Sequence, residues 1–181
     1  VRYFIPSLTH TIRTSSNVFT HTLVIFNSPQ NLALLIAGNN PLRALPRSIA
    51  DLHHLTKLFL TDNELTEIPE LLGNNNLPIV TLDVPYNRLT QLPSSTGKLA
   101  KLDSLDASGN TIRQLPASIR ELPMLQYLML KNNNFEAFPA GLLPLVQDEE
   151  NAVTAVMSDL LTLYLDYNQI TSLPAGPPGI L

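Results

Sequence analysis

The 181-residue chain contains no cysteine, so it can form no disulfide bond and offers no thiolate nucleophile or thiolate metal ligand. This absence favours a reducing compartment, where disulfides are rare. No apolar run approaches the roughly 18 residues that a membrane-spanning helix needs. The net charge of −4 gives no general attraction for nucleic acid or an anionic membrane. We therefore expect a cytoplasmic protein that binds neither nucleic acid nor membrane.

Sequence motifs for catalysis and cofactor binding are also missing. Neither a G-x-x-x-x-G-K-[ST] loop nor a G-x-G-x-x-G fingerprint occurs. The four histidines are His10, His21, His53 and His54, and the adjacent pair cannot share one face of a strand or helix. No carboxylate cluster has the spacing of metal ligands. We therefore expect no catalytic residue, no cofactor and no metal, and we predict that the chain is not an enzyme.

A ladder of asparagines organises what is present. The ladder runs through Asn17, Asn40, Asn63, Asn87, Asn110, Asn133 and Asn168, with steps of 23, 23, 24, 23, 23 and 35 residues. A fixed period of this size is the signature of a solenoid, in which each unit is one coil of the chain. Because one coil cannot bury its apolar side chains alone, neighbouring coils must stack to close the core.

The unit at residues 55–69 shows how one coil is built. In Leu58-Phe59-Leu60, alternate side chains point to opposite faces, so Leu58 and Leu60 face the core and Phe59 faces outward. Asn63 follows, and its amide can satisfy backbone groups of a neighbouring coil. The unit then closes with a core Ile68 and a proline, which removes an N–H where no ladder continues.

These repeats read L-x-x-L-x-L-x-x-N-x-L-x-x-L-P, a form that resembles the leucine-rich repeat family. The 23-residue step and the Leu-Pro ending resemble the intracellular class that includes the Ras-associated leucine-rich repeat scaffolds. The resemblance implies an α/β solenoid: a horseshoe with a parallel concave sheet and a short helical or irregular convex side. Extracellular members usually carry disulfide-bonded caps, which a chain without cysteine cannot form. A shared fold says little about function, because it hosts many functions.

The ladder divides the chain into three parts. Residues 1–30 are expected to form a degenerate first repeat and leader, residues 31–174 the leucine-rich repeats, and residues 175–181 an irregular tail. The extra residue of the 24-residue step falls in Gly73-Asn74-Asn75-Asn76, which suits a turn. No polar cap is evident at either end, so we expect the chain to be held within a larger polypeptide or assembly.

Two segments leave alternatives open. No acidic residue occurs before Asp51, which also fits an organelle import presequence at the beginning of the chain. The 35-residue step contains an insertion at about 146–157, where helical spacing follows an acidic start. This helix can pack on the convex side of the coils or dock a partner.

The outward strand positions form columns across the concave face, four, two and one residues before each asparagine. Large apolar residues are expected to be exposed toward both ends of this face, with acidic residues between them. Exposed aromatic side chains beside charges are typical of protein-binding hot spots. The predicted partner-binding residues are Ile36, Phe59, Asp62, Asp83, Asp106, Tyr127, Met129, Tyr164, Asp166 and Tyr167.

We predict a non-enzymatic interaction module or scaffold that presents its concave face to a protein partner. The stripe of Asp62, Asp83 and Asp106 suggests a basic patch on that partner. One alternative is an architectural subunit embedded in a large complex. Another, implied by the family resemblance, is a regulatory domain for a small GTPase or a phosphatase.

Overall fold

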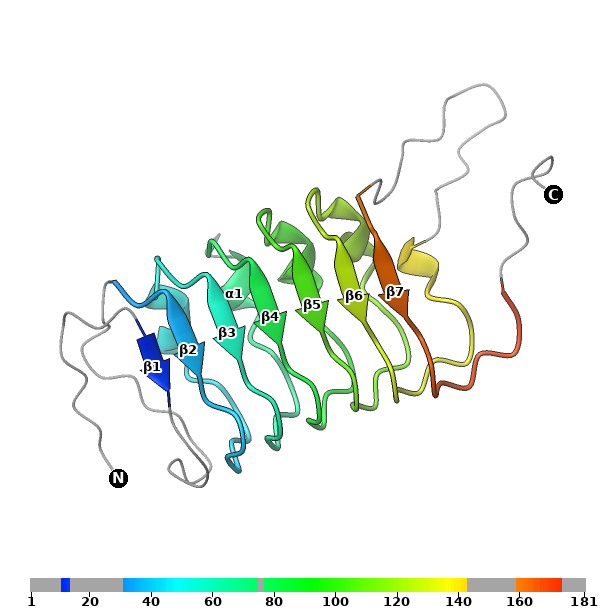
Figure 1. The fold of residues 1–181 in the computed structure, drawn as a ribbon, viewed down its shortest axis with the longest axis horizontal. Helices are drawn as coiled ribbons and strands as arrows, with labels where there is room; N and C mark the ends of the chain where they lie inside the picture. Colours follow the sequence, from blue (N-terminus) through cyan, green and yellow to red (C-terminus); the bar gives the residue numbers. More distant parts are fainter. Residues whose placement is uncertain (1–10, 14–30, 75–76, 143–158, 174–181) are drawn as a thin grey trace.

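The computed structural model describes residues 11–13, 31–74, 77–142 and 159–173. These residues form one sheet of seven parallel strands, arranged across the sheet in the order of the sequence (Figure 1). The strands are β1 (Thr11–Arg13), β2 (Leu34–Ile36), β3 (Lys57–Phe59), β4 (Thr81–Asp83), β5 (Ser104–Asp106), β6 (Tyr127–Met129) and β7 (Thr162–Tyr164). We number the coils one to seven after the strand that each contains.

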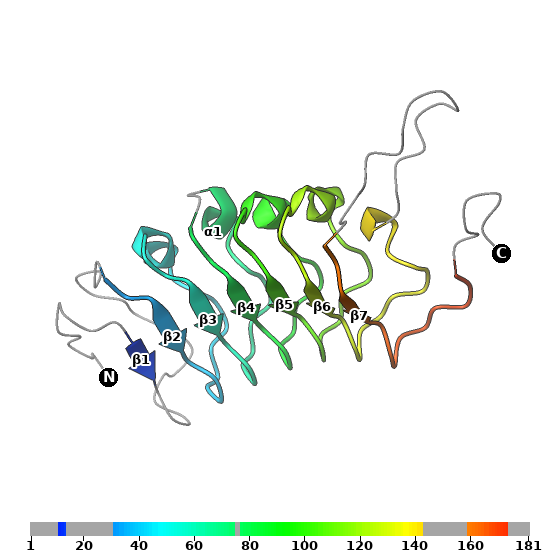
Figure 2. The ribbon, with the colours of Figure 1, turned by 45° about the horizontal axis from the view of Figure 1, so that its top comes forward.

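Short helical turns lie on the opposite side of the coils from the strands, as Figure 2 shows. They are the 3-10 turns η1 (Arg47–Asp51), η2 (Ser94–Lys98), η3 (Ala117–Glu121) and η4 (Ala140–Leu142), and the single α-helical turn α1 (Leu71–Asn74). A parallel sheet on one wall and short turns on the other make a leucine-rich repeat solenoid, which confirms the predicted fold class.

The strand register agrees with the asparagine ladder along its whole length. The residue four positions before each asparagine pairs with its counterpart in the next strand, and the resulting column is Arg13, Ile36, Phe59, Asp83, Asp106, Met129 and Tyr164. The pairing of β6 with β7 keeps this register although the step there is 35 residues. The insertion therefore leaves the concave sheet unbroken.

The core lies between the two walls and consists almost entirely of aliphatic residues. In coil 3, Leu58 and Leu60 are fully buried, Lys57 is exposed, and Leu65 and Ile68 are buried. The same alternation buries Leu82 in coil 4 and repeats in coils 2 and 6. This confirms which residues were predicted to face inward, because a three-residue strand exposes every second side chain.

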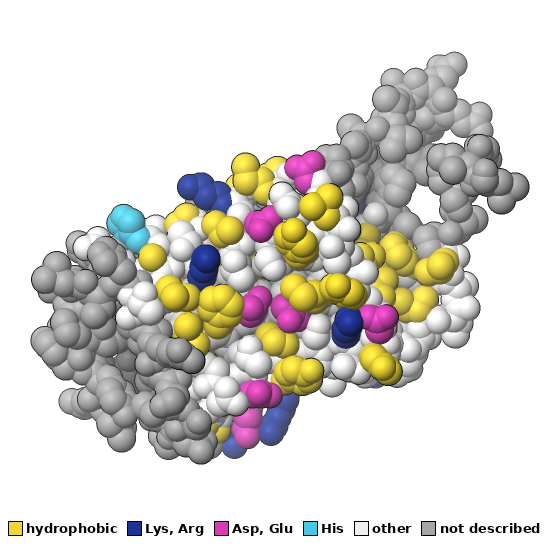
Figure 3. All heavy atoms as spheres, viewed as in Figure 1, with side chains coloured by type: hydrophobic (Ala, Val, Ile, Leu, Met, Phe, Trp, Pro, Cys, Tyr) yellow, Lys and Arg dark blue, Asp and Glu magenta, His cyan; other side chains and the backbone are white. Residues whose placement is uncertain are grey.

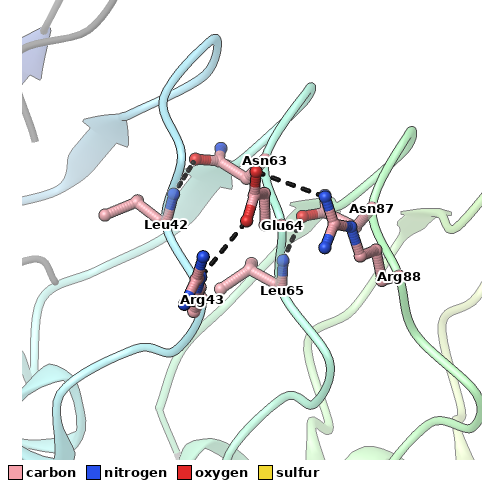
Figure 4. A network of polar contacts seen from close by, with 7 residues as sticks. All are labelled: Leu42, Arg43, Asn63, Glu64, Leu65, Asn87 and Arg88. Atoms are coloured by element: carbon pink, nitrogen blue, oxygen red, sulfur yellow. Dashed lines mark hydrogen bonds and ion pairs between the residues drawn. The ribbon is translucent and has the colours of Figure 1, made fainter. Parts of the chain in front are cut away.

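The asparagine side chains connect the coils by a repeated set of hydrogen bonds. Asn63 Nδ2 donates to the carbonyl of Leu60 at 2.9 Å and to the carbonyl of Ala37 in the preceding coil at 3.0 Å. Its Oδ1 accepts from the backbone N–H of Leu42, also in the preceding coil, at 3.2 Å (Figure 4). Equivalent bonds join the later coils through Asn87, Asn110, Asn133 and Asn168. The predicted role of these amides is confirmed.

From Asn40 onward, the residue before each asparagine of the ladder adopts the left-handed conformation, with φ between 51° and 65°. These residues are Asn39, Asp62, Tyr86, Gly109, Asn132 and Tyr167. Asparagine, aspartate and glycine tolerate this conformation, whereas a bulky side chain is strained in it. The two tyrosines are therefore exceptions to an otherwise permissive column.

The convex turn of coil 3 differs from its neighbours because this coil has the 24-residue step. Here the Asn74 N–H donates to the carbonyl of Glu70 at 3.1 Å, a four-residue spacing that makes α1 a turn of α-helix. The prediction of a turn was wrong for Gly73 and Asn74, which belong to α1. A β-carbon at Gly73 would lie 1.9 Å from the carbonyl oxygen of Ser95, so the close contact between coils requires glycine.

Several predictions fall outside the described residues. They concern the leader apart from 11–13, Asn75 and Asn76, the insertion at 146–157 and the tail at 175–181. These remain predictions.

Candidate functional site

The candidate site is the concave face of the sheet, which Figure 3 views directly. Acidic side chains lie near the middle of this face and hydrophobic side chains lie on both sides of them (Figure 3). The register assigns the central column to Ile36, Phe59, Asp83, Asp106, Met129 and Tyr164. The structure thus brings six of the ten predicted residues into one row across the coils.

The apolar residues at the N-terminal part of this row are less exposed than predicted. Ile36 and Phe59 are half-buried. Neighbouring parallel strands lie only about 4.8 Å apart, so bulky side chains in register cover one another. The prediction that these two residues are exposed was wrong in degree, although both still contribute to the surface.

Asp83 and Asp106 form the centre of the face. They are directly paired in register on β4 and β5, and both side chains are half-buried. Asp106 Oδ1 accepts a hydrogen bond from the backbone N–H of Ser108 at 2.9 Å. Burial, and then the negative charge of Asp106, raise the pKa of Asp83 to about 6. Among the described residues, no lysine, arginine or histidine forms an ion pair with either carboxylate.

Asp62 does not belong to this acidic pair. It lies at the left-handed position of coil 3, with φ of 54°, and its backbone N–H donates to the carbonyl of Pro85 at 3.1 Å. Its register is therefore with Tyr86 rather than with Asp83. The predicted stripe of three acidic residues was wrong in this respect: Asp83 and Asp106 are stacked side by side, and Asp62 lies beyond the C-terminal end of its strand.

Coils 6 and 7 present a second group of site residues. Tyr127 and Tyr164 are 40% and 42% exposed. Lys131 Nζ lies 3.2 Å from Asp166 Oδ2 and 4.3 Å from the centre of the Tyr164 ring. The lysine thus supplies a cation to both a carboxylate and an aromatic face within the chain. Tyr167, at the left-handed position of coil 7, is 80% exposed.

One residue of this surface was missed by the sequence analysis. Tyr86 is 55% exposed and lies at the left-handed position of coil 4, between Asp62 and Gly109 in register. The available signal was a tyrosine at a position that takes asparagine, aspartate or glycine in four other coils. A bulky residue in the left-handed backbone conformation suggests that its side chain has a function that outweighs the strain.

Two other kinds of feature are absent from the described residues: a cluster of metal ligands and a membrane span. Within the ranges that the structure describes, no group of three or more His, Asp or Glu side chains is placed to hold a metal ion. None of the helical segments in this part of the chain has the length and hydropathy of a membrane span. The concave face therefore presents a surface of aromatic and acidic side chains.

Comparison with known families agrees with this architecture. Residues 54–75 match one model of the leucine-rich repeat and residues 78–135 match another. These ranges carry coils 3 to 6, and the same strand register extends beyond them on both sides. The matches identify residues 54–135 as leucine-rich repeats, and together with the shared register they support a leucine-rich repeat protein.

Individual proteins show the same likeness. A leucine-rich repeat and calponin homology domain-containing protein of Drosophila melanogaster is 36% identical over 96 aligned residues, which cover 41% of this chain and 12% of the fly protein. Among solved structures, an LRR protein of Leptospira interrogans superposes with a TM-score of 0.57 at 28% identity, covering 80% of this chain and 40% of that one.

A second similar structure is the LRR ectodomain of the membrane receptor kinase GASSHO1/SCHENGEN3 of Arabidopsis thaliana. Its TM-score is 0.63 at 28% identity, covering 75% of this chain and 17% of the receptor, and it was solved in complex with CASPARIAN STRIP INTEGRITY FACTOR 2. This chain therefore spans less than half the length of each protein compared here. Leucine-rich repeat domains in general mediate protein–protein interaction rather than catalysis.

Proposed function

We propose that this chain is a non-enzymatic interaction module that binds a protein partner on its concave face, and that the partner presents a basic patch. The observation that carries the proposal is the pair of Asp83 and Asp106, stacked in register at the centre of that face and half-buried. Two like charges placed side by side raise the energy of the unbound chain. A partner cation would relieve this repulsion.

The surroundings of the acidic pair supply the rest of an interface. Phe59 lies on one side of the pair and Met129 on the other, in the same row of the sheet. Tyr127 and Tyr164 extend the apolar surface over coils 6 and 7. A charge surrounded by aromatic and apolar side chains is the usual composition of a binding hot spot, because the apolar rim excludes water from the ion pair.

Crosslinking mass spectrometry after affinity purification tests where a partner lies. Lys57 and Lys131 belong to the concave strands and their loops, whereas Lys98 ends the convex turn η2 and Lys101 follows it. Partner crosslinks at Lys57 and Lys131 support concave binding. Crosslinks confined to Lys98 and Lys101 contradict it.

Substitution of the aromatic residues tests the same proposal by affinity. Phe59→Ala and Tyr164→Ala should each weaken the captured partner by about 1 kcal/mol or more, while the chain stays folded. Met124→Ala is the matched control, because Met124 is 54% exposed but lies outside the proposed site. Unchanged affinity in both site variants would remove the aromatic residues from the interface.

A second candidate function, an architectural subunit, is favoured by one observation at coil 7. Leu161 and Leu173 are 70% and 76% exposed, far more than the buried leucines of the inner coils. Packing of another subunit against this end of the solenoid would bury them. For either function we propose a reducing compartment, on the absence of cysteine.

A further inference from the structure

Tyr86 has a backbone conformation that its residue type disfavours. Its φ is 54°, in the left-handed region, where a residue with a bulky side chain is an outlier. The equivalent positions in coils 2, 3, 5 and 6 hold Asn39, Asp62, Gly109 and Asn132, which all tolerate this region. An asparagine would suit the backbone at position 86 better, so the backbone conformation does not explain the tyrosine.

The ring of Tyr86 lies against the next coil at a place that only glycine leaves open. A β-carbon built on Gly109 would lie 2.5 Å from Tyr86 Cδ1 and 2.9 Å from Cε1. Gly109 has a φ of 65°, so it also suits its own backbone conformation. The glycine therefore allows the ring to rest on the backbone of coil 5, while 55% of the tyrosine stays exposed to solvent. The ring thus has a packing contact within the chain before any partner binds.

The loop that supports the ring also holds an acidic group. Asp106 Oδ1 accepts from the N–H of Ser108, the residue directly before Gly109. The same short segment, residues 106–109, thus holds one carboxylate at the centre of the concave face and supports one aromatic ring where the strands end. Within the described part of the chain, no Lys or Arg side chain pairs with Asp106 or lies over the Tyr86 ring.

Coils 6 and 7 show how this fold combines the same groups with a cation. There Lys131 lies 3.2 Å from the Asp166 carboxylate and 4.3 Å from the centre of the Tyr164 ring. Coils 4 and 5 carry a carboxylate and a tyrosine without that cation. The comparison within one molecule indicates which chemical group coils 4 and 5 can accept.

We propose that Tyr86 is a preformed contact for an arginine side chain of the protein partner, and that Gly109 is the residue that positions its ring. Arginine fits better than lysine, because its planar guanidinium can stack on the exposed ring and its several N–H donors suit the carboxylates of the same face. This inference rests on the proposed concave-face function and deepens it: it adds a residue and specifies the partner side chain.

The test is an NMR titration of the whole chain with synthetic peptides. The probe is a short glycine–serine peptide carrying arginine, compared with the same peptide carrying lysine or the uncharged isostere citrulline. The arginine peptide should shift the amide signals of Tyr86 and Gly109, the lysine peptide should bind more weakly, and the citrulline peptide should leave these signals unchanged.

Two variants separate a binding role from a structural one. Tyr86→Asn keeps a residue type suited to the left-handed backbone and should weaken the arginine peptide about fivefold. Met124→Asn, which removes an equally exposed side chain elsewhere, should have no effect on this affinity. Gly109→Ala should also weaken binding, but it should add nothing once Tyr86 has been replaced, because it acts through the ring.

The outcomes for this inference and for the proposed function are distinguishable. If Asp83→Asn weakens the arginine peptide and Tyr86→Asn does not, the role of Tyr86 is wrong and concave binding stands. If the peptide binds and none of the concave variants alters its affinity, both are wrong. If the arginine peptide causes no shift at millimolar concentration, the arginine contact is refuted, and the crosslinking experiment alone decides the proposed function.

Discussion

Coils 4 and 5 and coils 6 and 7 carry the same kinds of side chain on the concave face, but in different states. In coils 6 and 7, Lys131 neutralises Asp166 and covers the Tyr164 ring. In coils 4 and 5, Asp83 and Asp106 lie side by side, and the nearby Tyr86 is held in a strained backbone conformation. The difference shows that one concave sheet can hold both kinds of carboxylate: one that is paired with a lysine of the chain, and two that are not, only a few strands away.

The largest expected effect concerns the ladder that both regions share. Asn110 Nδ2 donates to three backbone carbonyls and its Oδ1 accepts from the N–H of Leu89, all in the core. Asn110→Ala leaves these groups buried and unpaired and should lower the free energy of unfolding by about 3 kcal/mol. Asn168→Ala, in the half-buried coil 7, should lower it by only about 1 kcal/mol. Urea denaturation measures both, and equal losses would contradict a difference between inner and terminal coils.

The next effect concerns the charge of the acidic pair. Because Asp83 has a raised pKa of about 6, its ionisation disfavours the folded state, and this cost is fully present above that pH. Asp83→Asn should therefore raise the free energy of unfolding at pH 7 by about 1 kcal/mol, after allowance for solvent screening of a half-exposed group. The gain over wild type should shrink as pH falls through 6 and vanish below about 4, where Asp83 is protonated in both states.

Thermal unfolding at several pH values checks this prediction. Asp166→Asn is the control, because Asp166 is already paired with Lys131 and its replacement should not stabilise the chain. Destabilisation by Asp83→Asn at pH 7 would show that the acidic pair is satisfied within the chain. It would also remove the main argument for a basic partner.

The smallest expected effect concerns Lys131. Its removal should give coils 6 and 7 an unpaired carboxylate beside a tyrosine, as in coils 4 and 5. Lys131→Gln removes the cation from Asp166 and Tyr164 and should cost about 0.5 kcal/mol of stability, as is usual for an exposed pair. It should also create a second place for the arginine peptide, visible as new amide shifts at Tyr164 and Asp166. Lys57→Gln serves as the control for the loss of one positive charge. If only Lys57→Gln increases peptide binding, the comparison between the two regions fails.

Sequence reasoning predicted the backbone of this molecule well, because periodicity is a property of the backbone. The asparagine step alone placed Arg13 opposite Ile36 and Asp106 opposite Met129, and the strand pairs have this register. Sequence reasoning failed where the size of neighbouring side chains decides how exposed a residue is. The half-burial of Phe59 depends on how much its neighbours cover it, and no repeat pattern contains that information.

The candidate site shows the same limit. The ladder placed Asp83 and Asp106 in one column and Asp62, one residue before its asparagine, in another, so joining the three into one stripe was an error of interpretation. Tyr86 occupied a position that the pattern had already singled out, yet its significance appears only from the contact of its ring with Gly109. The raised pKa of Asp83 likewise depends on burial, which the register alone does not give.

The asparagine ladder has a direction, and this direction has a consequence for how the solenoid comes apart. In each step the Oδ1 of one coil satisfies an N–H of the coil before it, as Asn63 does for Leu42 and Asn168 for Phe135. Loss of coil 7 thus leaves the Phe135 N–H without its acceptor, whereas loss of a coil at the other end leaves an asparagine Nδ2 short of a carbonyl, as Asn63 would lose that of Ala37. Coil 7 is also less deeply buried than the inner coils, so fraying should begin there, each detached turn loosening the one behind it.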